Sequence, residues 1–280
     1  MSRISASAWG LLAILVATLL AATGCLPTPP RPGVLPTPPR PRVVAALGDS
    51  ITRGFDSCGP LAECPQVSWA TGTDPGVLSH LSRLAGGARL AAYNDAITGA
   101  ASADLFHEAQ QAVRQRADYV IVLIGANDVC TDTERQMTPS AVFGSRVRAA
   151  LTYLHDALPG VRIFVASVPD VHRLWQVASV VPQARMVWQV ARVCQSMLAN
   201  PLSRGTADIA RRGRVQHRVA DNNAALHQAC AAVAGCTDDR GAVYRYPFAL
   251  ADLSGWDYFH PNRNGQRILS DVTFRMAFGP

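Results

Sequence analysis

The residues of this chain that could do chemistry begin with a glycine, an acid and a serine that follow an apolar run. Residues 43–47 are continuously apolar, and Gly48, Asp49 and Ser50 come directly after them. Such a run is typical of a strand buried on both faces, and the loops after such strands carry the chemistry of open α/β folds. Ser50 is therefore a candidate nucleophile. The alternative is a Gly-Asp turn in which Ser50 caps the next helix.

Three further polar clusters could complete a site. Residues 94–100 follow a second apolar run, residues 125–128 (G-A-N-D) follow a third, and residues 257–262 (D-Y-F-H-P-N) stand near the end of the chain. A serine hydroxyl is a poor nucleophile unless a base lies within hydrogen-bond reach, and His260 could supply that base. Asp257, three residues earlier, could hold the imidazole in the required tautomer. Each cluster is a weak signal when taken alone.

Taken in order, the clusters resemble the motif blocks of the SGNH (GDSL) hydrolase family, which read G-D-S, a loop glycine, G-x-N-D and D-x-x-H-P. The resemblance covers residues 43–280 and is strongest with the phospholipase B-like lipase/esterase branch, because of the V-V-A-A-L-G-D-S-I-T opening, Ser68-Trp69 and the cysteine soon after Asn127. The G-x-S-x-G elbow of α/β-hydrolases does not occur around the G-D-S serine. Thr98 stands where the family usually has serine before the loop glycine.

The resemblance implies an ester hydrolase with a Ser-His-Asp triad and an acyl-enzyme intermediate. Ser50 would attack the ester carbonyl, His260 would accept its proton, and Asp257 would orient the imidazole. The backbone N–H groups of Ser50 and Gly99 and the side-chain amide of Asn127 would form the oxyanion hole.

The expected substrate is an acyl lipid or a small ester, and neither a cofactor nor a metal is expected. One alternative is a carbohydrate acetyl esterase on the same fold. Another is a catalytically silent domain that binds lipid or glycan in the same cleft. Asp49 and Asp128 are interpreted as acids that brace their loops, since the D-x-x-H motif already provides the orienting acid.

The elements that would position these residues alternate between strand and helix. Strands are expected over residues 43–47, 89–93, 119–124, 162–168 and 243–248. Helices are expected over residues 102–116 and 141–158 and through most of 171–234, with breaks at Pro182 and Pro201. This alternation predicts a parallel sheet with helices on both faces. The resemblance implies a three-layer α/β/α flavodoxin-like fold with a mostly parallel five-stranded sheet.

The apolar stretch over residues 171–198 permits two interpretations. It contains Trp175, Met186, Trp188 and Met197. These side chains could pack in the core. They could instead form an acyl-binding wall or lid, because flexible methionine and broad aromatic side chains suit an apolar ligand.

An export signal is expected over residues 1–25. Arg3 is followed by an uncharged, largely apolar stretch, and the A-T-G-C at its end resembles a bacterial lipobox in which Cys25 would carry a lipid. The alternatives are simple cleavage with secretion and an uncleaved membrane anchor. Residues 26–42 contain L-P-T-P-P-R-P twice, which predicts an extended spacer before a domain at 43–280.

The cysteines support export, because six remain when the lipidation candidate is set aside. They are Cys58, Cys64, Cys130, Cys194, Cys230 and Cys236. An even set in an exported chain predicts three disulfides, although several pairings are open. Bonding each closely spaced pair would close short loops and leave the two central cysteines for each other. Zinc is the competing use of cysteine, but no C-x2-C spacing occurs.

Composition gives further bounds. At 280 residues and 49% hydrophobic, the chain can bury a core in one domain, and we expect a monomer. The net charge is +6, and all 26 basic residues are arginine. The R-R-G-R run at residues 211–214 could contact nucleic acid, but no nucleic-acid motif surrounds it. A solvated helix end is the expected interpretation.

Overall fold

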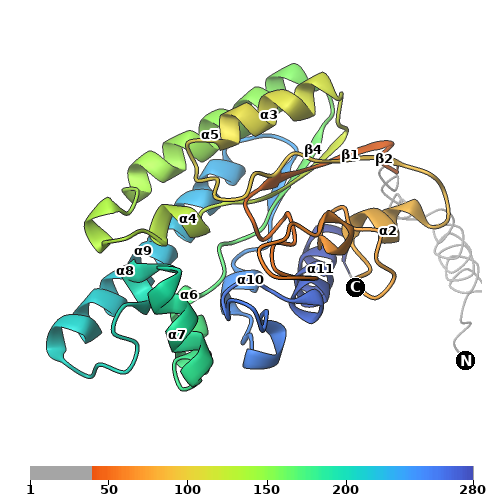
Figure 1. Ribbon diagram of the computed structural model, residues 1–280. Helices are drawn as coiled ribbons and strands as arrows, with labels where there is room; N and C mark the ends of the chain where they lie inside the picture. The colour runs from red at the N-terminus through yellow and green to blue at the C-terminus, as the bar shows by residue number, and fades with distance from the viewer. Residues whose placement is uncertain (1–39, 280) are drawn as a thin grey trace, which may run out of the picture. The chain divides into compact units, whose positions relative to one another are not determined.

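A sheet of five parallel strands lies at the centre of the computed structural model, which describes residues 40–279 (Figure 1). The strands are β1 (Val43–Gly48), β2 (Ala91–Asn94), β3 (Tyr119–Leu123), β4 (Arg162–Val165) and β5 (Cys236–Asp238). Our expectations for residues 1–25, the lipidation of Cys25 and most of the proline-rich spacer lie outside the described residues. The described residues belong to one compact unit that begins at Arg40.

Helices cover both faces of this sheet. The α-helices are α2 (His80–Ala85), α3 (Leu105–Arg114), α4 (Ala126–Val129), α5 (Ser140–Ala157), α6 (Val171–Ala178), α7 (Pro182–Val190), α8 (Gln195–Leu198), α9 (Thr206–Ala231), α10 (Ala242–Arg245) and α11 (Arg263–Phe278). The 3-10 turns are η1 (Pro65–Val67), η2 (Glu134–Gln136) and η3 (Leu250–Asp252). Helices α3 and α5 lie on one side of the sheet, with α9 packed against α5, and α2 and α11 lie on the other side (Figure 1).

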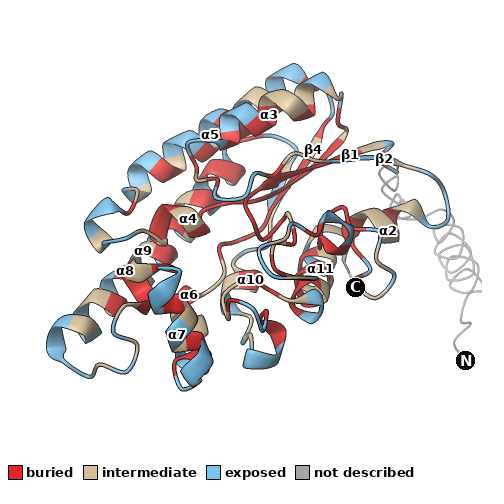
Figure 2. Ribbon diagram, in the orientation of Figure 1, coloured by how far each residue is buried: buried red, intermediate tan, exposed pale blue. Residues whose placement is uncertain are grey.

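The central strand β3 shows why helices are needed on both faces. Ile121 and Leu123 pack into the core on one side of the sheet, and Val120 and Val122 pack into the core on the other. The inner strands β1, β3 and β4 are mostly buried, as Figure 2 shows at the centre of the sheet, whereas the edge strands β2 and β5 are exposed or intermediate. Because successive side chains of a strand point to opposite faces, a strand covered twice needs an apolar residue at every position. The apolar runs in the sequence therefore predict the layers correctly.

The strand order is β2-β1-β3-β4-β5, and every neighbouring pair is parallel. This is the flavodoxin-like order, in which ligands bind beyond the carboxyl ends of the strands where β1 meets β3. The expected three-layer fold with a five-stranded sheet is thereby confirmed. The order also places the residues after β1, β2 and β3 at one edge of the sheet.

The fifth strand is not where the sequence predicts it. Residues 243–248 hold most of α10 and an irregular stretch, while the edge strand β5 pairs with β4. The Asp239 carboxylate accepts hydrogen bonds from the backbone N–H groups of Gly241 and Val243, which favours a helical start there. Strand β5 has the sequence C-T-D and therefore carries no apolar run that could reveal it.

The arginine run at residues 211–214 lies inside α9 and is not a solvated helix end. Arg212 is 2% exposed, and its guanidinium lies 4.4 Å from the centre of the Trp175 ring. Arg211 donates hydrogen bonds to the backbone carbonyls of Gln195 and Ala199. The expectation is wrong because Arg211 donates to backbone carbonyls and Arg212 stacks on the Trp175 ring, so the two side chains pack against the protein instead of pointing into water.

Three disulfides are present, and each closely spaced cysteine pair is bonded. They are Cys58–Cys64, Cys130–Cys194 and Cys230–Cys236. Disulfides are compatible with an exported protein. Within residues 40–279, no helix combines the length and the apolar character that a membrane crossing requires.

Candidate active site

Ser50, His260 and Asp257 form a continuous chain of hydrogen bonds beyond the carboxyl end of β1. The Ser50 Oγ lies 2.8 Å from His260 Nε2, and His260 Nδ1 lies 2.5 Å from Asp257 Oδ2. Ser50 is 7% exposed and Asp257 is 8% exposed. If Asp257 accepts the Nδ1 proton, Nε2 is left to accept the proton of the serine hydroxyl. The structure thus brings together the three residues that the sequence predicts to act together.

A short turn lets Asp257 bind the imidazole that follows it. Its Oδ1 accepts hydrogen bonds from the backbone N–H groups of Phe259 at 2.9 Å and His260 at 3.1 Å, while Oδ2 faces the ring. Tyr258 closes the turn with a φ of +54°, in the left-handed region. Burial acts to raise the pKa of the Asp257 carboxyl, but the hydrogen bonds from the ring and the backbone outweigh it and lower that pKa. The carboxylate is therefore ionised as well as fixed.

Contacts from distant segments hold the loop that carries these two residues. The Ser254 N–H donates to the His260 carbonyl at 2.7 Å, and the Ser254 Oγ donates to the Asp56 carbonyl at 2.8 Å. The indole Nε1 of Trp188, in α7, donates to the Asp257 carbonyl at 3.1 Å. The orientation of the imidazole therefore depends on segments from both sides of the pocket.

Ser50 stands in a tight turn that requires glycine at its start. Gly48 has a φ of +141°, and a Cβ there would lie 2.0 Å from the Leu123 carbonyl oxygen of β3. Asp49 Oδ1 accepts a hydrogen bond from the Ile51 N–H at 2.9 Å, which confirms its interpretation as a bracing acid. Burial raises the pKa of Asp49 to about 7.

A second buried acid, Glu108 of α3, supports the same turn. Its side chain accepts a hydrogen bond from the Gly48 N–H at 2.7 Å, and the residue is 0% exposed. Burial raises the pKa of Glu108 to about 8. The folded protein therefore keeps this carboxyl neutral at pH 7, where an exposed glutamate would be ionised.

We expect Glu108→Gln to reduce the loss of stability at rising pH. The unfolded chain releases the Glu108 proton near its ordinary pKa of 4.5, whereas the folded protein holds it to about 8. The free energy of unfolding therefore falls as the pH rises between these values, because the folded state binds the extra proton. Glutamine retains an oxygen for the Gly48 N–H and has no proton to release. The free energy of unfolding, measured in urea at about pH 5 and about pH 8, should differ between the two pH values by less in the variant than in the wild type. The reduction should be on the order of 1 kcal/mol or more.

Asp156→Asn is the control for this measurement, because Asp156 is exposed on α5. It should leave the difference between the two pH values unchanged. An undiminished difference in Glu108→Gln would contradict a neutral carboxyl at position 108.

The three residues of the predicted oxyanion hole, Ser50, Gly99 and Asn127, line one pocket. The predicted donors are the backbone N–H groups of Ser50 and Gly99 and the side-chain amide of Asn127. Among residues 40–279, neither N–H group donates to a backbone carbonyl. The Asn127 amide donates one hydrogen to the Ala100 carbonyl at 2.8 Å, which leaves its second hydrogen for a ligand. Their role in binding an oxyanion stays a prediction.

Asp128 connects the two loops that carry Gly99 and Asn127. Its carboxylate accepts hydrogen bonds from the Ser102 backbone N–H at 2.8 Å and from the Ser102 Oγ at 2.6 Å. Asp128 is 1% exposed, so water does not compete with these bonds. The expectation that this acid braces its loop is confirmed.

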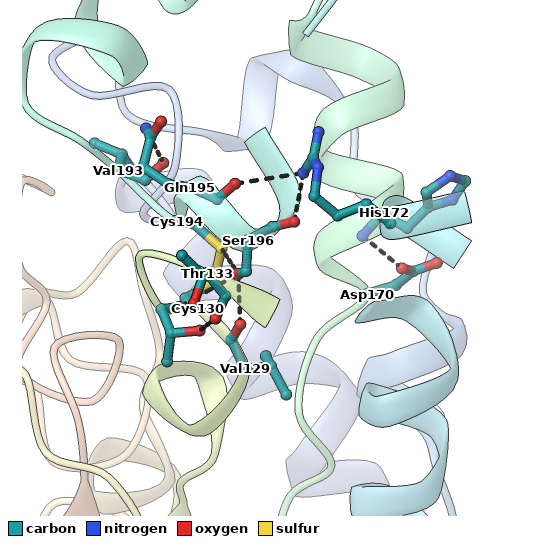
Figure 3. Close-up of a disulfide and its surroundings, with 11 residues drawn as sticks. Val129, Cys130, Thr133, Asp170, His172, Val193, Cys194, Gln195 and Ser196 are labelled. Carbon is teal, nitrogen blue, oxygen red and sulfur yellow. Dashed lines mark hydrogen bonds between the residues drawn. A yellow bond between two sulfur atoms is a disulfide. The ribbon is translucent and has the colours of Figure 1, made fainter. Parts of the chain in front are cut away.

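A disulfide joins Cys130 and Cys194 (Figure 3), and both cysteines line the pocket. It joins the end of α4 to the start of α8, where the Ser196 Oγ also donates to the Val129 carbonyl at 2.6 Å. The bridge therefore connects the helix that carries Asn127 to the α7–α8 segment.

The pocket has a volume of about 390 Å³ and a largely apolar lining. The apolar side chains are those of Phe55, Pro60, Leu61, Val187, Ala191, Val193, Trp256 and Phe259. The ionisable side chains are those of Asp56, Asp257 and His260. Because Leu61 is 85% exposed and Trp256 is 55% exposed, apolar surface extends from the pocket to its rim.

The apolar wall is not formed by the residues that the sequence suggests. Trp188 and Met197 are buried in the core, at 1% and 0% exposure. The Trp175 indole donates to the Pro201 carbonyl, and Met186 is 59% exposed without lining the pocket. Core packing is the right interpretation of the two buried residues. Within α7, Val187 lines the pocket instead, because a helix presents only one side to it.

Asp56 is a pocket residue that the sequence analysis misses. It is 2% exposed. One of its carboxyl oxygens, one carboxyl oxygen of Asp257 and one ring nitrogen of His260 all lie within 4.8 Å of one another. Within residues 40–279, this is the one cluster compact enough to hold a metal ion. Both ring nitrogens of His260 are already hydrogen-bonded to Ser50 and Asp257, and we assign no metal.

Two solved structures are similar to this chain in fold. An α/β hydrolase from the metagenome of Lake Arreo, Spain, has a TM-score of 0.55 and 17% sequence identity, and the match covers 85% of this chain and 95% of that one. A variant of an acetyl-xylooligosaccharide esterase from Geobacillus stearothermophilus has a TM-score of 0.53 and 17% identity over 85% and 94% of the two chains. At these identities the similarity shows the fold alone. No curated protein sequence matches the chain.

The sequence itself matches the GDSL-like lipase/acylhydrolase family over residues 46–268. The match extends from β1 into α11 and includes the G-D-S turn, the loop with Asn127 and the turn from Asp257 to His260. The phospholipase B-like branch is not distinguished by it and stays a prediction. Because this match covers most of the chain, the chain belongs to the GDSL-like lipase/acylhydrolase family.

Proposed function

We propose that the protein is a serine ester hydrolase that works through an acyl-enzyme. The observation that carries the proposal is the hydrogen-bonded chain from the Ser50 hydroxyl through His260 to the ionised Asp257. The membership of the family supports ester chemistry. The donors around Ser50 that have no backbone acceptor support a site for a negatively charged oxygen.

In the proposed reaction, the Ser50 Oγ attacks the ester carbonyl carbon while its proton passes to His260 Nε2. Asp257 holds the opposite ring nitrogen and stabilises the imidazolium. The imidazolium then gives its proton to the departing alcohol oxygen, which leaves an ester on Ser50. Water attacks this ester, His260 accepts the water proton, and the acid product departs as the serine hydroxyl is restored.

We propose an acyl lipid or a small neutral ester as the substrate. The pocket lining is dominated by apolar side chains, and none of its lining residues is Lys or Arg. A hydrocarbon chain placed there would lose contact with water, whereas a highly charged group would find no cation to pair with. Helix α7 supplies Val187 to this lining, with Ala191 just beyond its end.

A series of p-nitrophenyl esters from acetate to palmitate tests this function. Each buried methylene contributes up to about 0.8 kcal/mol, so kcat/KM should rise severalfold per pair of carbons from acetate toward medium chains. Val187→Ser should flatten this rise and leave acetate hydrolysis within about twofold, because it alters the wall and spares the triad.

Val190→Ser is the matched control, since Val190 lies on the same helix, is 79% exposed and does not line the pocket. It should leave the chain-length profile unchanged. A preference for acetate that Val187→Ser does not alter would reject the acyl-lipid substrate, and acetylated sugars would then be the substrates to test. Absence of hydrolysis across the series would leave a silent binding domain.

A further inference from the structure

Hydrogen bonds hold the backbone and one carboxyl oxygen of Asp56 in place. Its Oδ1 accepts a hydrogen bond from the Leu61 N–H at 2.5 Å, and its own N–H donates to the Ala62 carbonyl at 2.9 Å. Its carbonyl accepts the Ser254 Oγ, and its φ of +56° lies in the left-handed region that few residues other than glycine adopt. A backbone held in this conformation beside the proposed nucleophile favours a role for the side chain that it positions.

The Asp56 carboxyl group faces Asp257 and His260, because one of its oxygens lies within 4.8 Å of a carboxyl oxygen of Asp257 and of a ring nitrogen of His260. Two carboxylates this close repel each other, so one of them takes up a proton more readily than an isolated carboxylate would. Asp257 is kept ionised by His260, so the proton belongs mainly to Asp56. Burial, together with the neighbouring Asp257 carboxylate, raises the pKa of Asp56 to about 6. The pair titrates as a unit.

We propose that Asp56 is a positioning residue that tunes the basicity of His260 through the carboxylate of Asp257. The inference rests on the proposed function, because it assigns His260 the part of the base. When Asp56 is neutral, Asp257 is the only one of the two acids that presents a negative charge to the imidazole. When Asp56 is ionised, two carboxylates face the imidazole, stabilise the imidazolium and make the ring a stronger base.

One more acid acts on this cluster. Asp49, beneath the nucleophile turn, interacts electrostatically with His260 and is itself influenced by Asp128. Because the pKa of Asp49 is raised to about 7, it ionises close to the range in which Asp56 does. A comparison between the wild type and a variant at position 56 alone leaves the Asp49 contribution in place and isolates that of Asp56.

The decisive variant is Asp56→Asn. Asparagine retains an oxygen for the Leu61 N–H and carries no charge, so it mimics the neutral carboxyl at every pH. An NMR titration of the His260 ring nitrogens should show the midpoint of the variant shifted to lower pH, by roughly one unit. A purely structural role for Asp56 would leave this midpoint unmoved.

The pH dependence of kcat/KM on a p-nitrophenyl ester is the second readout. The acid limb should move to lower pH in Asp56→Asn, because the imidazole sheds its proton more readily. Turnover at about pH 8 should fall by roughly 3- to 10-fold, because the imidazolium is less stabilised in the transition state. The two profiles should therefore approach or cross at low pH. Asp156→Asn makes the same change of charge on exposed α5 and should reproduce the wild-type profile.

Two further outcomes separate this inference from the proposed function. An unmoved His260 midpoint, or a profile lowered by the same factor at every pH, would overturn the role of Asp56 even if esters are hydrolysed. A shifted midpoint in a protein that hydrolyses no ester would support the electrostatic coupling and reject the function. Asp56→Ala, which also loses the acceptor of the Leu61 N–H, should add a loss of thermal stability that Asp56→Asn does not show.

Discussion

Replacing Ser50 or His260 with alanine should lower kcat on a p-nitrophenyl ester by on the order of 10⁴-fold or more. The first change removes the proposed nucleophile, and the second removes the imidazole that lies 2.8 Å from its oxygen and is the proposed base. Because the two groups act as a unit, the double variant should be about as inactive as the worse single variant. Steady-state kinetics at saturating ester would measure all three.

Matched controls are available on α5, where Ser145 and His155 are exposed. Ser145→Ala and His155→Ala make the same chemical changes away from the pocket and should retain wild-type turnover. Circular dichroism should show all the variants folded. Activity above about a tenth of the wild type in Ser50→Ala or His260→Ala would remove the assignment of the triad.

Asn127→Ala should reduce kcat by roughly 10²- to 10³-fold with little change in KM. The alanine removes the amide donor from the pocket, and a donor that binds the oxyanion contributes in the transition state more than in the ground state. It also removes the hydrogen bond to the Ala100 carbonyl, so some loss of thermal stability should accompany it.

Asn127→Asp separates the two effects. It has a similar shape but presents an acceptor or a negative charge to the developing oxyanion, and it should therefore be at least as slow as the alanine variant. A rise in KM with kcat preserved would instead make Asn127 a substrate ligand and would leave the proposed oxyanion hole with backbone donors alone.

The meeting of Ser50, His260 and Asp257 with the proposed oxyanion-hole residues could be predicted because each lies within a short motif, and because parallel strands end at one edge of the sheet. Ser50 follows β1, Gly99 follows β2 and Asn127 follows β3. Once the strand order is known, local motifs from distant parts of the chain must meet. Asp257 and His260 are spaced so that one turn joins them.

Features that depend on packing could not be predicted in the same way. Asp56 is aimed at Asp257 by its unusual φ and by the contact with Ser254, and neither leaves a pattern in the sequence. The composition of residues 171–198 suggests that Trp188 could belong to an acyl-binding wall. Its position in the core, with the indole on the Asp257 carbonyl, follows from how α7 docks.

The central disulfide has a consequence for the unfolded chain. Cys130 and Cys194 are 64 residues apart, whereas the cysteines of each other bridge are 6 apart. Closing the longer loop removes more conformational entropy from the unfolded ensemble, on the order of 4 kcal/mol against about 2 kcal/mol for each short loop. The bridge that lines the pocket therefore also limits how far α5, β4, α6 and α7 can separate from the rest of the chain once they unfold.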